Sequence, residues 1–536
     1  MRALVAATCA ALVIPLVASG CSAPSTGGDA TPDRLVLADS TDLGEFSPVA
    51  GYSATGVSPL YEGLLRPSAE DDTRLPPLEP ALAASDPVIS DDGRTWTVTL
   101  RDGIHFHDGT DLDSGDVAAT YRAVTDPASA SPSADDYTLI DHIDTPDEST
   151  IVFHLDAPNR EFSSRLLLGI APGERLTGGP ATESSLNTEP VGTGPYRLDA
   201  LSPTEATLSA DPDHRDGAPA VTTVIIRSVP DENTRAQLLL TGEIDGAPLP
   251  PRLAAGLDGR NGISVVSANS ADWRGVSLPM SDPFASDPAA RRAMNVAVDR
   301  DAIVDQVLAG EGQPATTPIT DAYPEHVPIE FGPDDPAART ARAGELLSDA
   351  GWEPGPDGIR TKNGARAELS VAYHADDSVR RELAAAFADQ MRPLGIAVEP
   401  RGTSWDEIEA NADSAAILLA GGDNPYTIDT QARRALHSRA PASGPFDNPG
   451  GYRNPALDAA LDRLREPGNR TPADELYQDV QRAYGDDPGY VIFATMRHTY
   501  AVRDTGHTGP APILEPHTHG VTWGPWWALS QWTPRP

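Results

Sequence analysis

The sequence predicts an α/β protein of more than one domain, with a β-rich first half, an α/β second half and a short tail. Its 536 residues are too many for one ordinary core, and the length suggests roughly two to four domains. Segments of alternating apolar and polar residues mark the first half, whereas helical spacing becomes common after about residue 269. A β-α-β succession over residues 367–402 is typical of an α/β lobe.

The strands are predicted from short apolar or alternating runs. Residues 35–38 (LVLA) form a short apolar run, and residues 149–155 alternate. Residues 95–106 alternate on both sides of an Arg-Asp-Gly turn, which predicts a β-hairpin. Residues 414–422 predict a further apolar strand that ends at two glycines.

The helices are predicted from their start signals. Asp113 or Ser114 can cap a helix whose apolar residues then recur at helical spacing. An Asp-Pro pair opens a helix over residues 287–310, which a glycine ends. Residues 57–67 predict a shorter helix followed by a turn.

Charge and cysteine content exclude several classes of function. The formal net charge is -39, so the surface repels nucleic acid and anionic lipid headgroups, and no nucleic-acid partner is expected. The only cysteines are Cys9 and Cys21. The rest of the chain therefore has no disulfide, no thiolate metal site and no cysteine nucleophile.

The N-terminus has the pattern of an export signal. Residues 1–20 combine one arginine, an apolar run and small residues, as a secretory signal peptide does. Residues 17–21 (VASGC) resemble the bacterial lipobox, which implies a lipid on Cys21; cleavage by an ordinary signal peptidase is the alternative. Residues 21–33 then form a Gly/Pro-rich flexible tether. We expect an extracytoplasmic protein anchored to the cell membrane by lipid.

Motifs for catalysis are missing. The glycines of residues 191–196 (VGTGPY) lack the lysine and the hydroxyl residue of a phosphate loop, and neither Gly-x-Ser-x-Gly nor His-Glu-x-x-His occurs. His105 and His107 share a strand face but have no evident third ligand for zinc. Carboxylate pairs are too numerous to exclude a hydrolase by counting. We expect no enzyme, no cofactor and no metal site, with a secreted hydrolase as the rival class.

Six landmarks, taken in order along the chain, resemble the family 5 extracellular solute-binding proteins of ABC importers, the peptide- and nickel-binding group. They are LYEGLL (60–65), DDGRTWTVTLRDGIHFHDGTDLDSGDVAATY (91–121), PVGTGPYRL (190–198), DPAARRAMNVAVDRDAIV (287–304), LLSDAGW (346–352) and NPGGYRNPALDAAL (448–461). The resemblance covers nearly the whole chain after the tether.

The resemblance implies a two-lobed periplasmic-binding-protein-like fold (type II, cluster C) with an extra β-rich domain on the first lobe. Lobe I would comprise residues 34–59, 190–268 and 505–536. The extra domain would comprise 60–189, and lobe II 269–504. The lobes would close around a solute and present it to a membrane permease. We expect a monomer whose partners are a peptide or peptide-like solute, the permease subunits and the membrane that holds its lipid anchor.

The resemblance also implies ligand-binding residues. Asp423 matches an aspartate that pairs with the α-amino group of a peptide, although a turn in GDNP explains it equally well. Trp273 and Trp405 fall where relatives place aromatic pocket walls, with core packing as the alternative for each. Tyr426 is a similar candidate.

Two further ligand-contact candidates, Gly51 and Tyr52, lie in a loop of lobe I. A departure from relatives at residues 278–279 puts a standard peptide in doubt. A metal chelate or opine-like solute is the alternative ligand, and a chaperone or sensory receptor the alternative binding role.

Overall fold

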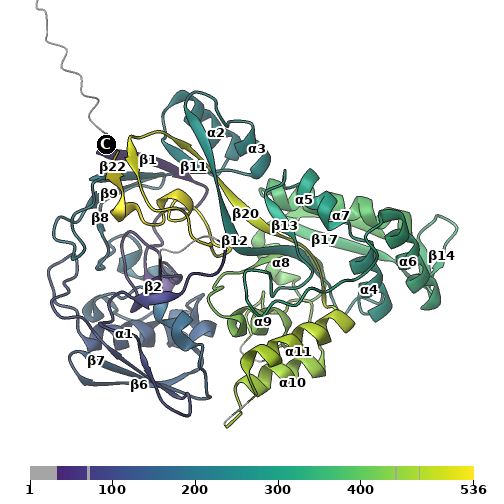
Figure 1. The fold of residues 1–536 in the computed structure, drawn as a ribbon, viewed down its shortest axis with the longest axis horizontal. Helices are drawn as coiled ribbons and strands as arrows, with labels where there is room; N and C mark the ends of the chain where they lie inside the picture. Colours follow the sequence, from purple (N-terminus) through teal and green to yellow (C-terminus); the bar gives the residue numbers. More distant parts are fainter. Residues whose placement is uncertain (1–32, 69–72, 441–442, 467, 470, 536) are drawn as a thin grey trace, which may run out of the picture.

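The computed structural model describes residues 33–535 except 69–72, 441–442, 467 and 470 (Figure 1). The predicted signal peptide, Cys21 and nearly all of the tether lie outside the described residues. Among the helices of the described part, none is long and apolar enough to cross a membrane.

A mixed sheet of eleven strands extends across the molecule. Its order is β18-β17-β19-β12-β20-β11-β1-β10-β9-β8, with β13 paired to β20 beside this path. The strands are β1 (Arg34–Asp39), β8 (Tyr196–Leu201), β9 (Glu205–Ala210), β10 (Thr223–Ser228), β11 (Gly246–Pro248), β12 (Ile263–Ser277), β13 (Gly312–Pro314), β17 (Glu368–His374), β18 (Ala397–Thr403), β19 (Ala416–Gly421) and β20 (Tyr490–Arg503). β1 is parallel to β10 and β11, and β17 to β18 and β19, while the other pairs are antiparallel.

The two long strands β12 and β20 connect the two sides of the molecule (Figure 1). They pair from Ile263↔Arg503 to Asn269↔Arg497, and again from Trp273↔Thr495 to Ser277↔Tyr490. The register shifts between these stretches, so the ladder is interrupted where the chain passes from one side to the other. We call the two sides lobe I and lobe II and keep the term extra domain for residues 60–189. The residue boundaries of these three parts remain a prediction.

The extra domain contains a four-stranded sheet in the order β4-β5-β7-β6. Its strands are β4 (Val88–Ile89), β5 (Thr95–Thr99), β6 (Ile140–Asp147) and β7 (Thr150–Leu155). Helix α1 (Ser114–Thr125) begins at Asp113, whose side chain accepts hydrogen bonds from the backbone N–H groups of Gly115 and Asp116 in a capping box. This confirms one of the two predicted caps.

The hairpin predicted over residues 95–106 is wrong. β5 pairs with β4 and β7, and β7 lies about fifty residues further along the chain. Ile104 and Phe106 are buried without forming a named strand. Alternation showed which face is buried but could not identify the partner strand.

The helix predicted over residues 57–67 is also wrong. The carbonyls of Pro59, Leu60 and Leu64 accept hydrogen bonds from Tyr196, Gly194 and Ala81, so they are not free for a helical ladder. β2 (Leu65–Pro67) then pairs with β3 (Leu78–Pro80).

Helices surround the lobe II half of the large sheet (Figure 1). They are α4 (Pro288–Ala297), α5 (Arg300–Gln306), α6 (Pro336–Asp349), α7 (Ser378–Met391), α8 (Trp405–Ala410), α9 (Ile428–Leu436), α10 (Pro455–Leu464) and α11 (Ala473–Asp486). The β17-α7-β18 unit confirms the predicted β-α-β succession. The helix predicted over residues 287–310 is two helices, because Asp299 leaves the helical conformation and caps α5.

Short elements complete the described fold. Lobe I carries α2 (Glu232–Thr241) and α3 (Pro251–Ala255). The remaining strands are β14 (Glu353–Pro354), β15 (Arg360–Lys362), β16 (Ala365–Arg366), β21 (His507–Thr508) and β22 (Thr533–Pro534).

The buried apolar residues form separate cores on the two sides. One core lies in lobe II and contains Trp352 and Phe387. A second joins the extra domain to lobe I, since Trp96, Tyr196 and Trp526 belong to it together. A small third core lies between the lobe I sheet and α2–α3. We infer that lobe I and the extra domain form one body, which meets lobe II at the β12–β20 connection.

Candidate functional site

A groove of about 420 Å³ lies between the lobes, beside the β12–β20 connection. Lobe I contributes Asp39, Glu232 and Arg235, and lobe II contributes Arg274, His374, Asp377 and Trp405. His498, on β20, also lines the groove. A concave site that both lobes line is the place where closing the lobes would enclose a ligand.

A second cavity, of about 400 Å³, has a different position. Its walls include Leu208 and Trp526 from lobe I and Gly63 from the extra domain. These residues belong to one body, so movement of lobe II would not enclose a ligand there. We therefore take the interlobe groove as the candidate site.

Trp405 stands at the wall of the groove. It is the first residue of α8, where the Ser404 hydroxyl caps the helix, and 38% of its surface is exposed. Its ring stacks on His374 at 5.3 Å and 13°, and the Arg380 guanidinium lies 5.2 Å from the ring centroid. Phe446 meets it edge-on. These contacts fix the indole while leaving part of it exposed for an aromatic or apolar contact.

Two buried arginines lie behind this wall and were not predicted. Arg274 donates from Nη2 to Asp272 at 2.7 Å, yet its Nε and Nη1 have no hydrogen-bond partner among the described residues. Arg380 is bonded to Asp377 at 2.6 Å, and its Nε is likewise unpartnered within the described chain. Burial, and then the charge of Arg274, lower the pKa of Arg380. We call these two residues the arginine pair.

The arginine pair offers positive charge and unused N–H donors beside the groove. Buried donors normally find partners, so unpaired ones in a cleft suit a ligand carboxylate or another anionic oxygen. The sequence contained one signal for Arg274, a basic residue two positions after an acidic one, Asp272, within the segment that forms β12. Arg380 had none, because charged residues are common on helices.

A buried polar group, the hinge cluster, lies where β12 and β20 change register. His498 Nδ1 lies 2.7 Å from Glu515 and its Nε2 lies 3.2 Å from Asp272. Although burial opposes it, hydrogen bonds to these two carboxylates raise the pKa of His498. Arg274 and His517 hold the pKa of Asp272 well below its usual range, also against the effect of burial.

The hinge cluster could hold a cation only at the expense of its own bonds. Asp272, His498 and His519 each place one ligand atom within 4.8 Å of the others. Both nitrogens of His498 already face carboxylates, which a proton on the imidazole satisfies. The cluster thus ties the two crossing strands and the C-terminal segment together through bonds between its own side chains.

Asp423 is the second residue after the end of β19. The residue between them, Gly422, has a φ of 104°, which is in the left-handed region. It is half-buried and is not among the described residues that line the groove. Although burial opposes it, the carboxylates of Asp136, Asp447 and Asp423 raise the pKa of Arg434. The predicted anchor for a ligand amine therefore faces a cation of the protein itself.

The other predicted site residues lie apart from the groove. Trp273 is 3% exposed, stands edge-on to Tyr490, and packs so closely under Gly421 that a Cβ there would clash with the indole. Tyr52 packs against Phe46 and Tyr61, and burial raises its pKa to about 12.

Gly51 and Tyr426 have structural contacts as well. Gly51 ends a short 3₁₀ turn with a φ of 94°, a conformation that favours glycine. Tyr426 donates from its hydroxyl to the carbonyl of Thr55, across the boundary between the two bodies, at 3.3 Å. Of the predicted ligand contacts, Trp405 is the one that lines the interlobe groove in the described part of the chain.

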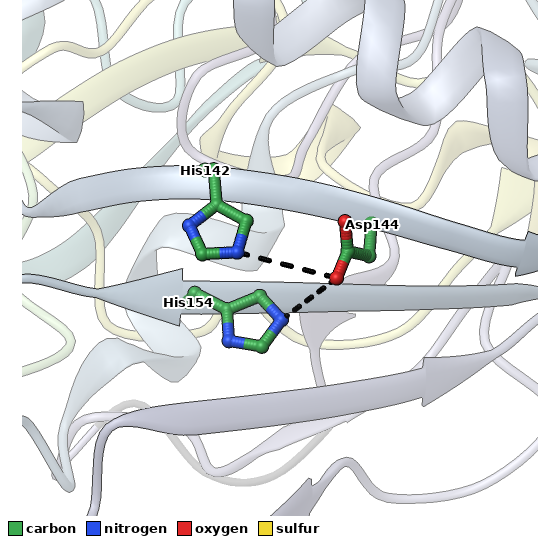
Figure 2. Close-up of side chains that lie close together, drawn as sticks. All are labelled: His142, Asp144 and His154. Carbon is green, nitrogen blue, oxygen red and sulfur yellow. Dashed lines mark ion pairs between the residues drawn. The ribbon is translucent and has the colours of Figure 1, made fainter.

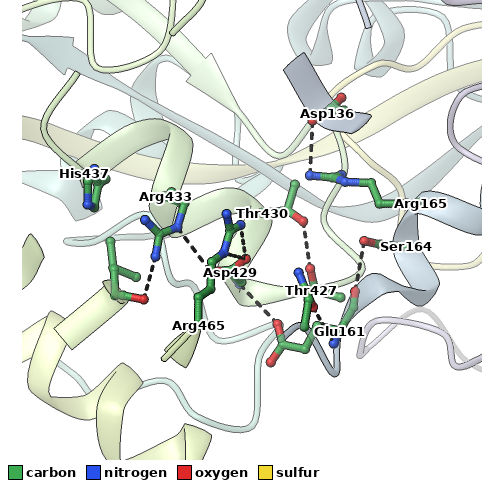
Figure 3. A network of polar contacts seen from close by, with 12 residues as sticks. Asp136, Glu161, Ser164, Arg165, Thr427, Asp429, Thr430, Arg433, His437 and Arg465 are labelled. Carbon is green, nitrogen blue, oxygen red and sulfur yellow. Dashed lines mark hydrogen bonds and ion pairs between the residues drawn. The ribbon is translucent and has the colours of Figure 1, made fainter. Parts of the chain in front are cut away.

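The two bodies also meet at a polar network (Figure 3), which we call the closing contact. Glu161 of the extra domain accepts hydrogen bonds from the Asp429 backbone N–H at 3.3 Å and the Tyr477 hydroxyl at 2.9 Å. Burial, and then the Asp429 carboxylate, raise the pKa of Glu161 to about 7. Asp429 itself is paired with Arg433 and Arg465.

Further contacts join lobe I directly to lobe II. The Ser378 hydroxyl donates to Glu232 at 3.0 Å, and Arg252 lies 3.7 Å from Glu382. Because the bodies touch through these pairs and through the closing contact, the structure shows the lobes together. The groove is the space left between them.

Comparisons with known proteins agree with this geometry. The family model for bacterial extracellular solute-binding proteins, family 5 Middle, matches residues 77–442. Protein XP55 of Streptomyces lividans is 36% identical over 508 residues, covering 92% of this chain and 90% of the relative. The glutathione-binding protein GsiB of Pectobacterium atrosepticum is 27% identical over 500 residues, covering 90% and 92%.

Solved structures share the fold. NikZ from Campylobacter jejuni, in complex with Ni(L-His), superposes with a TM-score of 0.81 at 24% identity, covering 94% of this chain and 99% of that one. The oligopeptide-binding protein AppA from Bacillus subtilis, in complex with a nonapeptide, gives 0.76 at 21% identity, with coverage of 94% and 99%. These matches confirm the two-lobed fold. The chain belongs to family 5 of the bacterial extracellular solute-binding proteins, a class that serves ABC importers.

Proposed function

We propose that this protein is the lipid-anchored binding component of an ABC importer. It captures a peptide or similar oligomeric solute in the interlobe groove, closes around it and delivers it to the permease. The observation that carries the proposal is the arginine pair: Arg274 lines the groove, Arg380 lies against the groove residue Trp405, and both keep N–H groups without a hydrogen-bond partner among the described residues. A carboxylate of the solute would satisfy these donors.

The wall of the groove supports a ligand with apolar or planar parts. Trp405 offers an indole face held by His374 and Arg380. Such a surface contacts ligands of different sequence with little specificity for any one side chain. In this proposal Asp423, which lies outside the described lining of the groove, pairs with the amine of a solute that extends beyond the groove, at the expense of its interaction with Arg434. Tyr52, Gly51, Tyr426 and Trp273 lie apart from the groove and support the fold around it.

A metal chelate is the second candidate solute. Imidazoles of His374 and His519 line the same groove, and imidazole is a common ligand for nickel and copper ions. Carboxylates of a chelating amino acid would meet the arginine pair in the same way. A peptide and a chelate are distinguished by whether binding of the released solute requires a metal.

The first test is mass spectrometry of solutes that copurify with the protein, followed by calorimetry. We expect one solute per chain, recovered unchanged after incubation. Trp405→Ala should weaken its binding roughly tenfold, since about 1–2 kcal/mol of apolar contact is lost. Val88→Ala is the matched control, because Val88 is an exposed apolar residue, at 68%, of the extra domain. Conversion of the solute to a product would support the hydrolase instead.

A further inference from the structure

Two histidines and an aspartate converge on the outer face of the extra-domain sheet (Figure 2). His142 on β6 and His154 on β7 are directly paired across the two strands. Asp144 follows two residues after His142, so its side chain lies on the same face. Ile143 lies between His142 and Asp144 on β6, and Phe153 precedes His154 on β7. Both of these apolar side chains point the opposite way, into the core. Alternation therefore leaves all three polar side chains at the surface.

The three side chains present their ligand atoms to one another. The Asp144 Oδ2 atom is 3.2 Å from His154 Nε2 and 4.0 Å from His142 Nε2. The two imidazole rings are stacked at 4.1 Å with an angle of 6° between their planes. Ligand atoms around a tetrahedral zinc ion, at about 2.1 Å from the metal, lie about 3.4 Å apart. The lone pairs of the two stacked rings run in nearly parallel planes, so the exposed His142 and Asp144 side chains must rotate to bring all three atoms onto one ion.

A second carboxylate orients one of the imidazoles. β6 carries a register shift between Ile140 and His142, and the extra residue there is Asp141. Its Oδ2 accepts a hydrogen bond from His142 Nδ1 at 2.7 Å. With the proton held on Nδ1, the lone pair of His142 Nε2 faces Asp144. Carboxylates orient metal-binding histidines in this way in many proteins.

The second imidazole has an unused nitrogen. His154 Nε2 is shielded from solvent and makes no hydrogen bond among the described residues, and its nearest charged neighbour is Asp144 Oδ2 at 3.2 Å. A single divalent cation between Nε2 of both rings and the Asp144 carboxylate would use one nitrogen lone pair from each ring.

We propose that His142, Asp144 and His154 form a binding site for a divalent late transition-metal ion such as Zn²⁺. Two imidazoles and one carboxylate suit this class of ion and not Ca²⁺ or Mg²⁺, which take oxygen ligands. Three protein ligands leave at least one position of a four-coordinate ion open. Water can reach that position, because 62% of the Asp144 side chain and 53% of the His142 side chain are exposed. The site is separate from the solute groove, whose described lining includes no residue of β6 or β7.

The test is Zn²⁺ titration of the whole metal-free protein by calorimetry, with Mg²⁺ and Ca²⁺ as comparison ions. We expect one Zn²⁺ per chain that is lost in His142→Ala and in His154→Ala, and no binding of Mg²⁺ or Ca²⁺ there. Asp141→Asn should weaken Zn²⁺ binding by roughly 10- to 100-fold through loss of the orienting bond. An ion held by the hinge cluster would persist in all these variants, so the difference in stoichiometry counts the new site.

His105→Ala is the matched control. His105 is an exposed histidine of the same domain, 2.6 Å from Asp111, and belongs to neither of the candidate metal groups among the described residues. Its variant should keep the full Zn²⁺ stoichiometry and affinity. Equal stoichiometry in wild type and His154→Ala, or an equal loss in His105→Ala, would overturn the proposal. Thermal unfolding in the presence of a chelator checks that each variant is folded.

Discussion

The closing contact predicts that acid favours the closed lobes. Glu161 is half-buried between the extra domain and lobe II, where its pKa is about 7 instead of the ordinary 4.5. When the lobes separate, solvent reaches this carboxylate and its pKa returns toward 4.5. The closed state therefore binds more protons between these two values. Lowering the pH from 7 toward 4.5 stabilises closure by up to about tenfold per pH unit.

The size of the effect follows from the same two values. A difference between 4.5 and about 7 corresponds to at most about 3 kcal/mol. Above pH 7 Glu161 is ionised in both states, and the closed state bears the whole cost of burying the charge. Below pH 4.5 it is protonated in both states, and the cost disappears. Asp429 remains ionised throughout this window, because Arg465 and Arg433 lower its pKa against the effect of burial.

Glu161→Gln removes this titration while keeping a hydrogen-bonding side chain beside Tyr477. Closure of the variant should be as favourable at pH 8 as closure of the wild type at pH 5. Residues 22–536 contain no cysteine, so a dye pair can be attached at Asp102→Cys and Asp474→Cys. Energy transfer between the dyes, measured from pH 4.5 to 8, reports the separation of the two bodies. The same pH dependence in wild type and Glu161→Gln would refute the reasoning.

Three other predictions concern single residues. Trp273→Ala should lower the free energy of unfolding by about 3–5 kcal/mol, because it empties a fully packed site, and urea unfolding measures this loss. Asp423→Ala should weaken binding of an amine-bearing solute but not of its N-acetyl form, and calorimetry that finds the amine unaffected would remove Asp423 as the anchor. Mass spectrometry should find Cys21 acylated at the mature N-terminus, whereas a mature chain that begins after Cys21 would exclude the lipid anchor.

Local signals in the sequence predicted local structure well. Asp113 and the Asp-Pro pair at residues 287–288 cap helices as expected, and the succession over residues 367–402 is a β-α-β unit. Signals that depend on distant partners failed. The alternation over residues 95–106 belongs to a strand that pairs with β7, and residues 57–64 bond to segments far along the chain.

The candidate site was harder to predict than the fold. A tryptophan in a strand and one at a helix start look alike in sequence, yet Trp273 is buried in the core and Trp405 lines the groove. The donors of Arg274 and the raised pKa of Glu161 depend on burial between segments more than a hundred residues apart. Such properties arise only when the two bodies are assembled.

The most direct test of the account pairs a change in the solute with a change in the groove. Calorimetry would compare the copurified solute and its carboxylate-amidated form, each with wild type and with Arg274→Lys. Loss of the charge-assisted hydrogen bonds of Arg274 is worth about 1.5–3 kcal/mol, roughly tenfold to a hundredfold in Kd. We predict that amidation weakens binding to the wild type by this factor and changes binding to Arg274→Lys much less. Equal affinity of the wild type for both forms would contradict recognition of a solute carboxylate in the interlobe groove.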